Sequence, residues 1–213
     1  MKTELILKEG YPFIFASAFF AVVSFLFLSK FWVVLAFLLL FFFIYFFRNP
    51  ERIPEDTAKN VIISPSDGTV LSISEAVSPL TKEEGLKISI RLSILDVHIQ
   101  RAPIKSEIKA KEYIHGEFLS LNNEKASELN EQNRVLFENE KIKIVVNQIA
   151  GFITRRIINF KDLGPVDLGE RYGMIMFGSQ VDVYLPKNVT LKVSEFQKIK
   201  AGESVIGYLN EEN

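Results

Sequence analysis

The dipeptide Gly178-Ser179 joins an unhindered carbonyl to a nucleophile, between two apolar runs, Met174–Phe177 and Val181–Leu185. One interpretation is structural, because a glycine inside a strand often marks a bulge or a close approach of another backbone. The other is chemical: a serine hydroxyl can attack the carbonyl that precedes it, and glycine tolerates the strained backbone that such a step requires. The bond between residues 178 and 179 is therefore a candidate site of self-cleavage.

Self-cleavage by a serine requires a base, because the hydroxyl is a poor nucleophile at neutral pH, and the base must itself be oriented. The chain contains two histidines. His98 lies in an alternating, strand-like segment, which predicts that Asp96, His98 and Gln100 share one face. Asp67 lies in a Pro-Ser-Asp-Gly turn. From the residues alone, structural roles stay open for both: His98 as a hydrogen-bonding core residue, and Asp67 as a turn residue that binds local N–H groups.

Composition excludes several kinds of function. The formal net charge is −1 and the sequence shows no polybasic run, so we expect no nucleic-acid partner, and any anionic ligand must be bound by a local cluster of cations. The chain has no cysteine and two histidines, which excludes disulfides and thiolate metal sites, and we expect no metal.

The N-terminal region is far more apolar than the rest, since 13 of the 19 phenylalanines lie between Tyr11 and Phe47. Two uncharged runs, 11–29 and 31–47, flank Lys30. Because a bilayer core takes about 20 helical residues, we expect a helical hairpin that anchors the chain in the membrane at 1–47. One long tilted helix and a re-entrant hairpin remain alternatives, and a cleaved signal peptide fits poorly. More basic residues lie on the terminal side (Lys2, Lys8, Arg48, Arg52) than at the turn, which predicts a cytoplasmic catalytic domain at 48–213.

The remainder predicts a mainly all-β domain. Short runs rich in β-branched residues, separated by Gly, Pro and Asn, predict strands at 61–63, 69–73, 86–92, 141–146, 174–177, 181–185 and 189–193. One polar helix is expected over 124–134. Segments 64–70 and 199–207 are similar to the two ends of a barrel-sandwich hybrid such as a lipoyl domain, so we expect a barrel or sandwich that the C-terminal segment closes.

Five segments, in order along the chain, resemble the short-form phosphatidylserine decarboxylase proenzymes of archaea and bacteria. They are Phe46-Phe-Arg-Asn-Pro-Glu-Arg52, Ser64-Pro-Ser-Asp-Gly-Thr-Val70, Asp96-Val-His-Ile-Gln-Arg-Ala-Pro103, Gln148-Ile-Ala-Gly-Phe-Ile-Thr-Arg-Arg-Ile157 and Gly169 to Pro186. The resemblance implies that the chain cuts itself between Gly178 and Ser179 into a β chain, 1–178, and an α chain, 179–213. Ser179 then becomes a covalent pyruvoyl cofactor, which forms a Schiff base with a serine phospholipid and accepts the electrons left when CO2 departs.

The resemblance also assigns roles. It implies that His98 is the base and a proton donor, and that Asp67 holds the tautomer of His98 and stabilises its imidazolium. Planar guanidinium groups bind phosphate and carboxylate, so the candidates for binding the lipid are Arg48, Arg101, Arg155, Arg156 and Arg171, with surface salt bridges as the alternative for each. Arg155 and Arg156 are expected on opposite sides of a strand. The chain departs from the family at Tyr113-Ile-His-Gly116, where the family usually has Tyr-His-Pro-Gly, and we therefore leave His115 out of the catalytic set.

The predicted function is decarboxylation of phosphatidylserine to phosphatidylethanolamine at the membrane. Archaetidylserine, an ether lipid with the same reacting head group, is an alternative substrate. An alternative from another class is a noncatalytic, membrane-tethered barrel-sandwich adaptor or carrier, although the sequence has no Met-Lys-Met hairpin of the kind that presents a modified lysine. The predicted partners are the lipid, the membrane and the two chains of one precursor, and self-association stays open.

Overall fold

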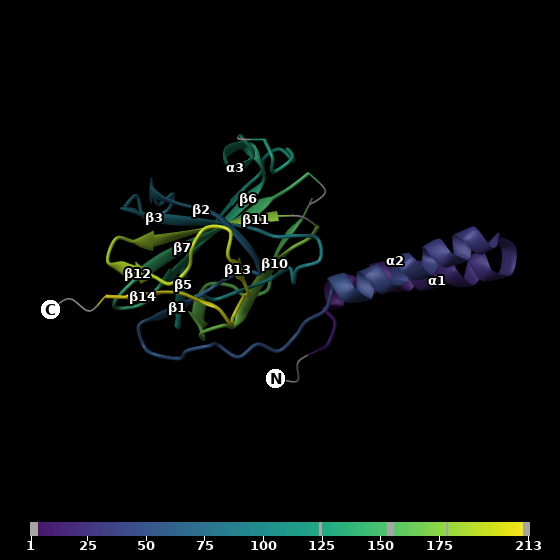
Figure 1. Ribbon diagram of the computed structural model, residues 1–213, viewed down its shortest axis with the longest axis horizontal. Coiled ribbons are helices and arrows are strands. Elements are labelled where there is room, and N and C mark those ends of the chain that lie inside the picture. The colour runs from purple at the N-terminus through teal and green to yellow at the C-terminus, as the bar shows by residue number, and fades with distance from the viewer. Residues whose placement is uncertain (1–3, 124, 153–155, 178, 211–213) are drawn as a thin grey trace. The chain divides into compact units, whose positions relative to one another are not determined.

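The computed structural model describes residues 4–123, 125–152, 156–177 and 179–210. The chain separates into two compact units, residues 1–51 and 52–213. The predicted boundary, between 47 and 48, lies four residues earlier. Figure 1 shows helices α1 and α2 in the first unit and the strands in the second.

The first unit is a pair of apolar helices, α1 (Tyr11–Phe27) and α2 (Lys30–Phe46), preceded by a 3-10 turn, η1 (Lys8–Gly10). The ring of Phe13 contacts that of Phe43 at one end of the pair, and Phe20 contacts Trp32 at the other, so the helices run antiparallel. Together η1 and α1 form a segment of 20 residues that is long and apolar enough to cross a membrane, whereas α2 has 17 residues. The N–H of Leu7 donates to Phe47 O at 3.0 Å, which ties the two ends of the unit together.

The second unit is mainly β, as the sequence predicts. Its elements are β1 (Val61–Ile63), β2 (Gly68–Val77), β3 (Glu84–Arg91), β4 (Ile99–Arg101), β5 (Ser106–Ile114), α3 (Ala126–Leu129), β6 (Gln132–Glu138), β7 (Lys143–Ala150), β8 (Ile157–Asn159), β9 (Gly164–Val166), β10 (Arg171–Ile175), β11 (Ser179–Pro186), β12 (Val189–Leu191), β13 (Lys198–Ile199) and β14 (Val205–Leu209).

In the described part of the chain, three antiparallel sheets surround one core. The largest has the order β13-β2-β3-β11-β7-β6-β5-β9, and the two smaller sheets are β1-β14-β12 and β4-β10-β8. All three contribute to one cluster of buried apolar side chains, for example Val181 from β11, Ile206 from β14 and Ile175 from β10. Strand β11 lies inside the large sheet, paired with β3 on one side and β7 on the other.

The predicted helix over 124–134 is wrong in most of its length. The described helical part is the four-residue α3, and residues 132–134 begin strand β6. The polar sequence favours a helix locally, but β6 pairs along its whole length with β5 and β7, and this pairing overrides local propensity. The prediction that Asp96, His98 and Gln100 share one face of a strand is also wrong, because β4 begins at Ile99. Asp96 lies in a bend, and His98 comes just before the strand.

Candidate active site

Ser179 is the first residue of β11 and its side chain is fully buried. It pairs with Ala150 of β7, and its carbonyl accepts a hydrogen bond of 3.0 Å from the N–H of Leu92, just after β3. Its hydroxyl has no hydrogen-bond partner among the described residues. A buried hydroxyl without a partner costs free energy, which is a common feature of groups kept for chemistry. Gly178 lies outside the described residues.

The residue before the dipeptide has an unusual backbone. Phe177 has φ of 55°, in the left-handed region that non-glycine side chains rarely adopt. Such a conformation costs on the order of 1–3 kcal/mol and is concentrated at functional sites. The backbone is therefore strained at Phe177, shortly after β10 ends.

His98 is fully buried beside the strand that leads to Ser179. Its carbonyl accepts from the N–H of Ile175 at 3.2 Å, and the next residue, Ile99, pairs with Met174. Its Nδ1 lies 2.9 Å from the carbonyl of Asp96. Because a carbonyl only accepts, this contact places the proton on Nδ1 and leaves Nε2 as the basic nitrogen of the neutral ring.

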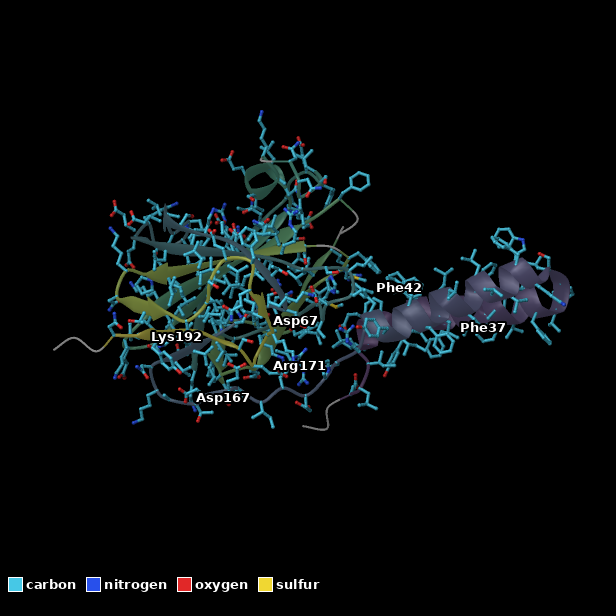
Figure 2. All side chains as sticks on the ribbon, in the orientation of Figure 1. Phe37, Phe42, Asp67, Asp167, Arg171 and Lys192 are labelled. Carbon is cyan, nitrogen blue, oxygen red and sulfur yellow. The ribbon has the colours of Figure 1, made fainter. Side chains whose placement is uncertain are left out.

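Asp67 lies in the turn before β2 and links three segments. Oδ1 accepts from the N–H of Ala201 at 2.8 Å, and Oδ2 accepts from the N–H of Val97 and from Arg52, both at 3.2 Å. The carboxylate thus holds the residue next to His98, and Figure 2 marks its position in the β domain. Burial raises the pKa of Asp67, against the opposing effects of the Arg52 charge and the two backbone N–H groups.

The candidate arginines occupy different environments. Arg101 is buried, and its guanidinium donates to Gly169 O at 2.9 Å. Arg171 is half-buried, and its backbone pairs with that of Arg101. Arg156 is exposed and comes just before β8. Arg48 belongs to the helical unit, where it lies 3.8 Å from the ring centre of Tyr45. Arg155 lies outside the described residues, as does its predicted orientation.

A chain of buried amides next to the site was not expected from the sequence. Gln148 Nε2 donates to Gln100 Oε1 at 2.9 Å, and Gln148 Oε1 accepts from Asn133 at 2.6 Å. Gln148 lies opposite Val181, two residues from Ser179 on the same face of the sheet. The sequence does show amide side chains inside apolar, β-branched segments, which indicates buried polar contacts. Which amides pair with one another depends on the register of three separate strands, β4, β6 and β7.

His115 and a large cleft lie apart from these residues. The side chain of His115 is 90% exposed, with Nδ1 4.0 Å from Glu131 Oε2. The cleft, of about 1020 Å³, is lined by the turn between β6 and β7, by residues around Ile104 and by residues 54–61. That turn is at the Lys143 end of β7, whereas Ser179 pairs at the Ala150 end. Its lining mixes lysines with carboxylates, so we assign it no part in the chemistry.

Residues 39–207 match the family model described as phosphatidylserine decarboxylase. The chain is 42% identical over 211 residues to a phosphatidylserine decarboxylase proenzyme of Geotalea uraniireducens (strain Rf4), with 98% of each chain covered. It is 42% identical to the proenzyme of Ehrlichia canis (strain Jake), covering 96% of this chain and 91% of the relative, and 39% identical to that of Burkholderia cenocepacia (strain J2315), covering 97% of each.

The chain belongs to the phosphatidylserine decarboxylase family. This confirms the resemblance on which the sequence analysis relied, and the family is one of carboxy-lyases. The matched region contains Asp67, His98 and Ser179. Within this phosphatidylserine decarboxylase domain, Ser179 begins β11, and the carbonyl of His98 accepts from the N–H of Ile175 at the end of β10. Asp67 accepts from the N–H of Val97, the residue before His98.

Proposed function

We propose that this chain is the proenzyme of a pyruvoyl-dependent decarboxylase that converts phosphatidylserine to phosphatidylethanolamine. The main support is family membership across nearly the whole chain. The structure adds that the buried Ser179 hydroxyl has no hydrogen-bond partner among the described residues and follows the strained Phe177 by two positions. A serine kept for structure normally finds a hydrogen-bond partner when it is buried.

In the proposed maturation, His98 Nε2 takes the proton of the Ser179 hydroxyl, and Oγ attacks the carbonyl carbon of Gly178. The C–N bond breaks, His98 returns the proton to the departing amine, and an ester replaces the peptide. A base then removes the Cα proton of residue 179, and the Cβ–O bond breaks to release chain 1–178 with a C-terminal carboxylate. Water converts the remaining dehydroalanine to a ketone and ammonia.

The surroundings of residue 179 fit a small covalent carbonyl group. Leu92 and Ala150 hold the backbone on either side, and the residue is buried among them. When formed, the pyruvoyl group supplies a carbonyl that accepts the electron pair released as CO2 departs. His98 then holds a proton for the carbon that loses CO2. The candidates for binding the anionic head group are Arg171, Arg156, Arg101, Arg155 and Arg48.

The two chains would remain together after cleavage. Strand β11, in the α chain, pairs along both edges with β3 and β7 of the β chain, and β14 pairs with β1. The carboxylate of Asp67 also accepts from Ala201, across the proposed cut. Two contacts also support a barrel-sandwich arrangement that the C-terminal segment closes. The N–H of Gly202 donates to Ser64 O at 2.8 Å, and β13 pairs with β2.

The helical hairpin would anchor the enzyme in the membrane, with the β domain on the cytoplasmic side, where it faces the inner leaflet. Support for membrane association comes from the 20-residue apolar segment Lys8–Phe27. The orientation rests on the excess of basic residues outside the hairpin.

The proposed function is tested by comparing wild type with Ser179→Ala and Ser194→Ala, each purified in detergent. Ser194 is exposed, in the same C-terminal segment, and serves as the matched control. We expect wild type and Ser194→Ala to separate into two pieces under denaturing conditions and to release CO2 from phosphatidylserine. Ser179→Ala should remain one inactive chain. Decarboxylation by uncleaved Ser179→Ala would refute the proposal.

A further inference from the structure

Two loops next to Ser179 expose large apolar side chains. The first follows β3 and contains Ile94 and Leu95, whose exposed fractions are 39% and 57%. The second follows β7 and contains Phe152, 67% exposed. We call Ile94, Leu95 and Phe152 the apolar rim.

Strand register places both loops at the Ser179 end of the large sheet. Leu92, where the first loop begins, donates to Ser179 O, and Ala150, where β7 ends, pairs with Ser179. Phe152 is two residues beyond Ala150, and Ile94 is two residues beyond Leu92. The apolar side chains are therefore within a few residues of the reactive serine, while Ser179 and His98 are fully buried.

An exposed cation lies at the same end of the domain. Arg156 comes just before β8, and its carbonyl accepts from the N–H of Met176, just after β10, at 3.2 Å. Exposed apolar side chains together with an exposed guanidinium at one end of a domain complement an interface that is apolar inside and anionic at its surface. The surface of a bilayer containing an anionic serine lipid has both properties.

We propose that the apolar rim inserts into the surface of the lipid bilayer and presents the head group directly to Ser179 and His98. This inference rests on the proposed function, because the substrate resides in that bilayer. The rim would act in addition to the helical hairpin: the hairpin tethers the chain, and the rim aligns the reactive end of the sheet with the lipid.

The first experiment separates interfacial docking from chemistry. The double variant Leu95→Gln/Phe152→Gln is compared with Val77→Gln in the full chain. Val77 is 56% exposed and ends β2 at the end of the sheet opposite Ser179. It is eight residues along β2 from Thr69, which pairs at the Ser179 end, or about 26 Å at roughly 3.3 Å per residue. We expect the double variant to cleave normally and to decarboxylate a short-chain, monomeric phosphatidylserine at the wild-type rate, but to lose about five- to tenfold in kcat/KM on vesicles. If the double variant keeps the same fraction of wild-type kcat/KM on vesicles as on the monomeric lipid, the proposal is overturned.

The second experiment does not depend on catalysis. Trp32 is the sole tryptophan, so Trp32→Phe combined with Ser179→Ala gives a silent, uncleaved background. Into it we would place Phe152→Trp or Val77→Trp and add phosphatidylserine vesicles with brominated acyl chains. Quenching of fluorescence from position 152 and not from position 77 supports the rim even if the wild-type enzyme proves inactive. Equal quenching at both positions, or at neither, overturns it.

Discussion

Replacing Asp67 with Asn tests how the site is held together. The substitution keeps the shape but removes the charge and turns one acceptor into a donor. One oxygen can still accept from Ala201, whereas the new amide group faces the N–H of Val97 and the guanidinium of Arg52. Each charge-assisted hydrogen bond contributes about 1.5–3 kcal/mol, so the two lost contacts set an upper bound of about 3–6 kcal/mol. Burial raises the pKa of Asp67 and offsets part of that gain. The amide N–H of the variant also faces two donors, a clash that protonation of the native carboxylate does not create, so we expect a loss of about 2–4 kcal/mol.

Two assays separate the consequences. Stability is measured by urea unfolding of the uncleaved Ser179→Ala chain, where, at about 2 kcal/mol per molar urea, the midpoint should fall by about 1–2 M. Processing is measured in chains that keep Ser179, by the appearance of the two pieces with time. We expect Asp67→Asn to slow processing at least tenfold at a temperature where the domain stays folded, because the N–H beside His98 loses its acceptor. The control is Asp167→Asn, whose exposed carboxylate pairs only with Lys105 among the described salt bridges and which Figure 2 labels. Processing of Asp67→Asn at the wild-type rate would remove Asp67 from the mechanism.

Three further predictions address the base, the buried acid and the amides. His98→Gln should leave an uncleaved chain, and normal processing, read on a denaturing gel, would exclude His98 as the base. Burial raises the pKa of Asp182, so the contribution of this residue to stability is present below its ordinary pKa and is lost as the pH rises through the raised value. Asp182→Asn should therefore stabilise the Ser179→Ala chain against urea at pH 7.5, by a margin that shrinks towards pH 4; a margin that grows on acidification would contradict this sign. Gln148→Leu leaves buried polar groups of Gln100 and Asn133 without their partner and should cost about 2 kcal/mol, or about 1 M in the urea midpoint, whereas an unchanged midpoint would show that the amide chain contributes nothing.

The seven predicted strands all overlap described ones, because their residues carry the signal themselves, whereas β5 and β6 were not predicted as strands. Val181–Leu185 is apolar and β-branched, and it lies in β11, between two partners. The prediction for segment 124–134 was wrong because its polar residues favour a helix locally. The pairing that makes 132–134 a strand comes from β5 and β7, which are other segments of the chain. Only the fold reveals such competition between local preference and sheet register.

The site was predictable as a set of residues but not as a geometry. The two histidines and the Gly-Ser dipeptide limit the choices in sequence, and family resemblance narrows them further. Asp67 ties Val97 to Ala201 through contacts between segments 30 and 134 residues apart, and the contact of the Asp96 carbonyl with Nδ1 of His98 depends on a bend before β4 that the alternating pattern did not predict. The spacing of residues in the sequence does not predict which of these groups contact one another.

The identity of residue 179 in the active protein tests the account most directly. Mass spectrometry of catalytically active, denatured protein should show two pieces, 1–178 and 179–213, the smaller one beginning with a pyruvoyl group that reacts with hydroxylamine. A single intact chain of 24.3 kDa with an ordinary serine at position 179, in a preparation that decarboxylates phosphatidylserine, would contradict it.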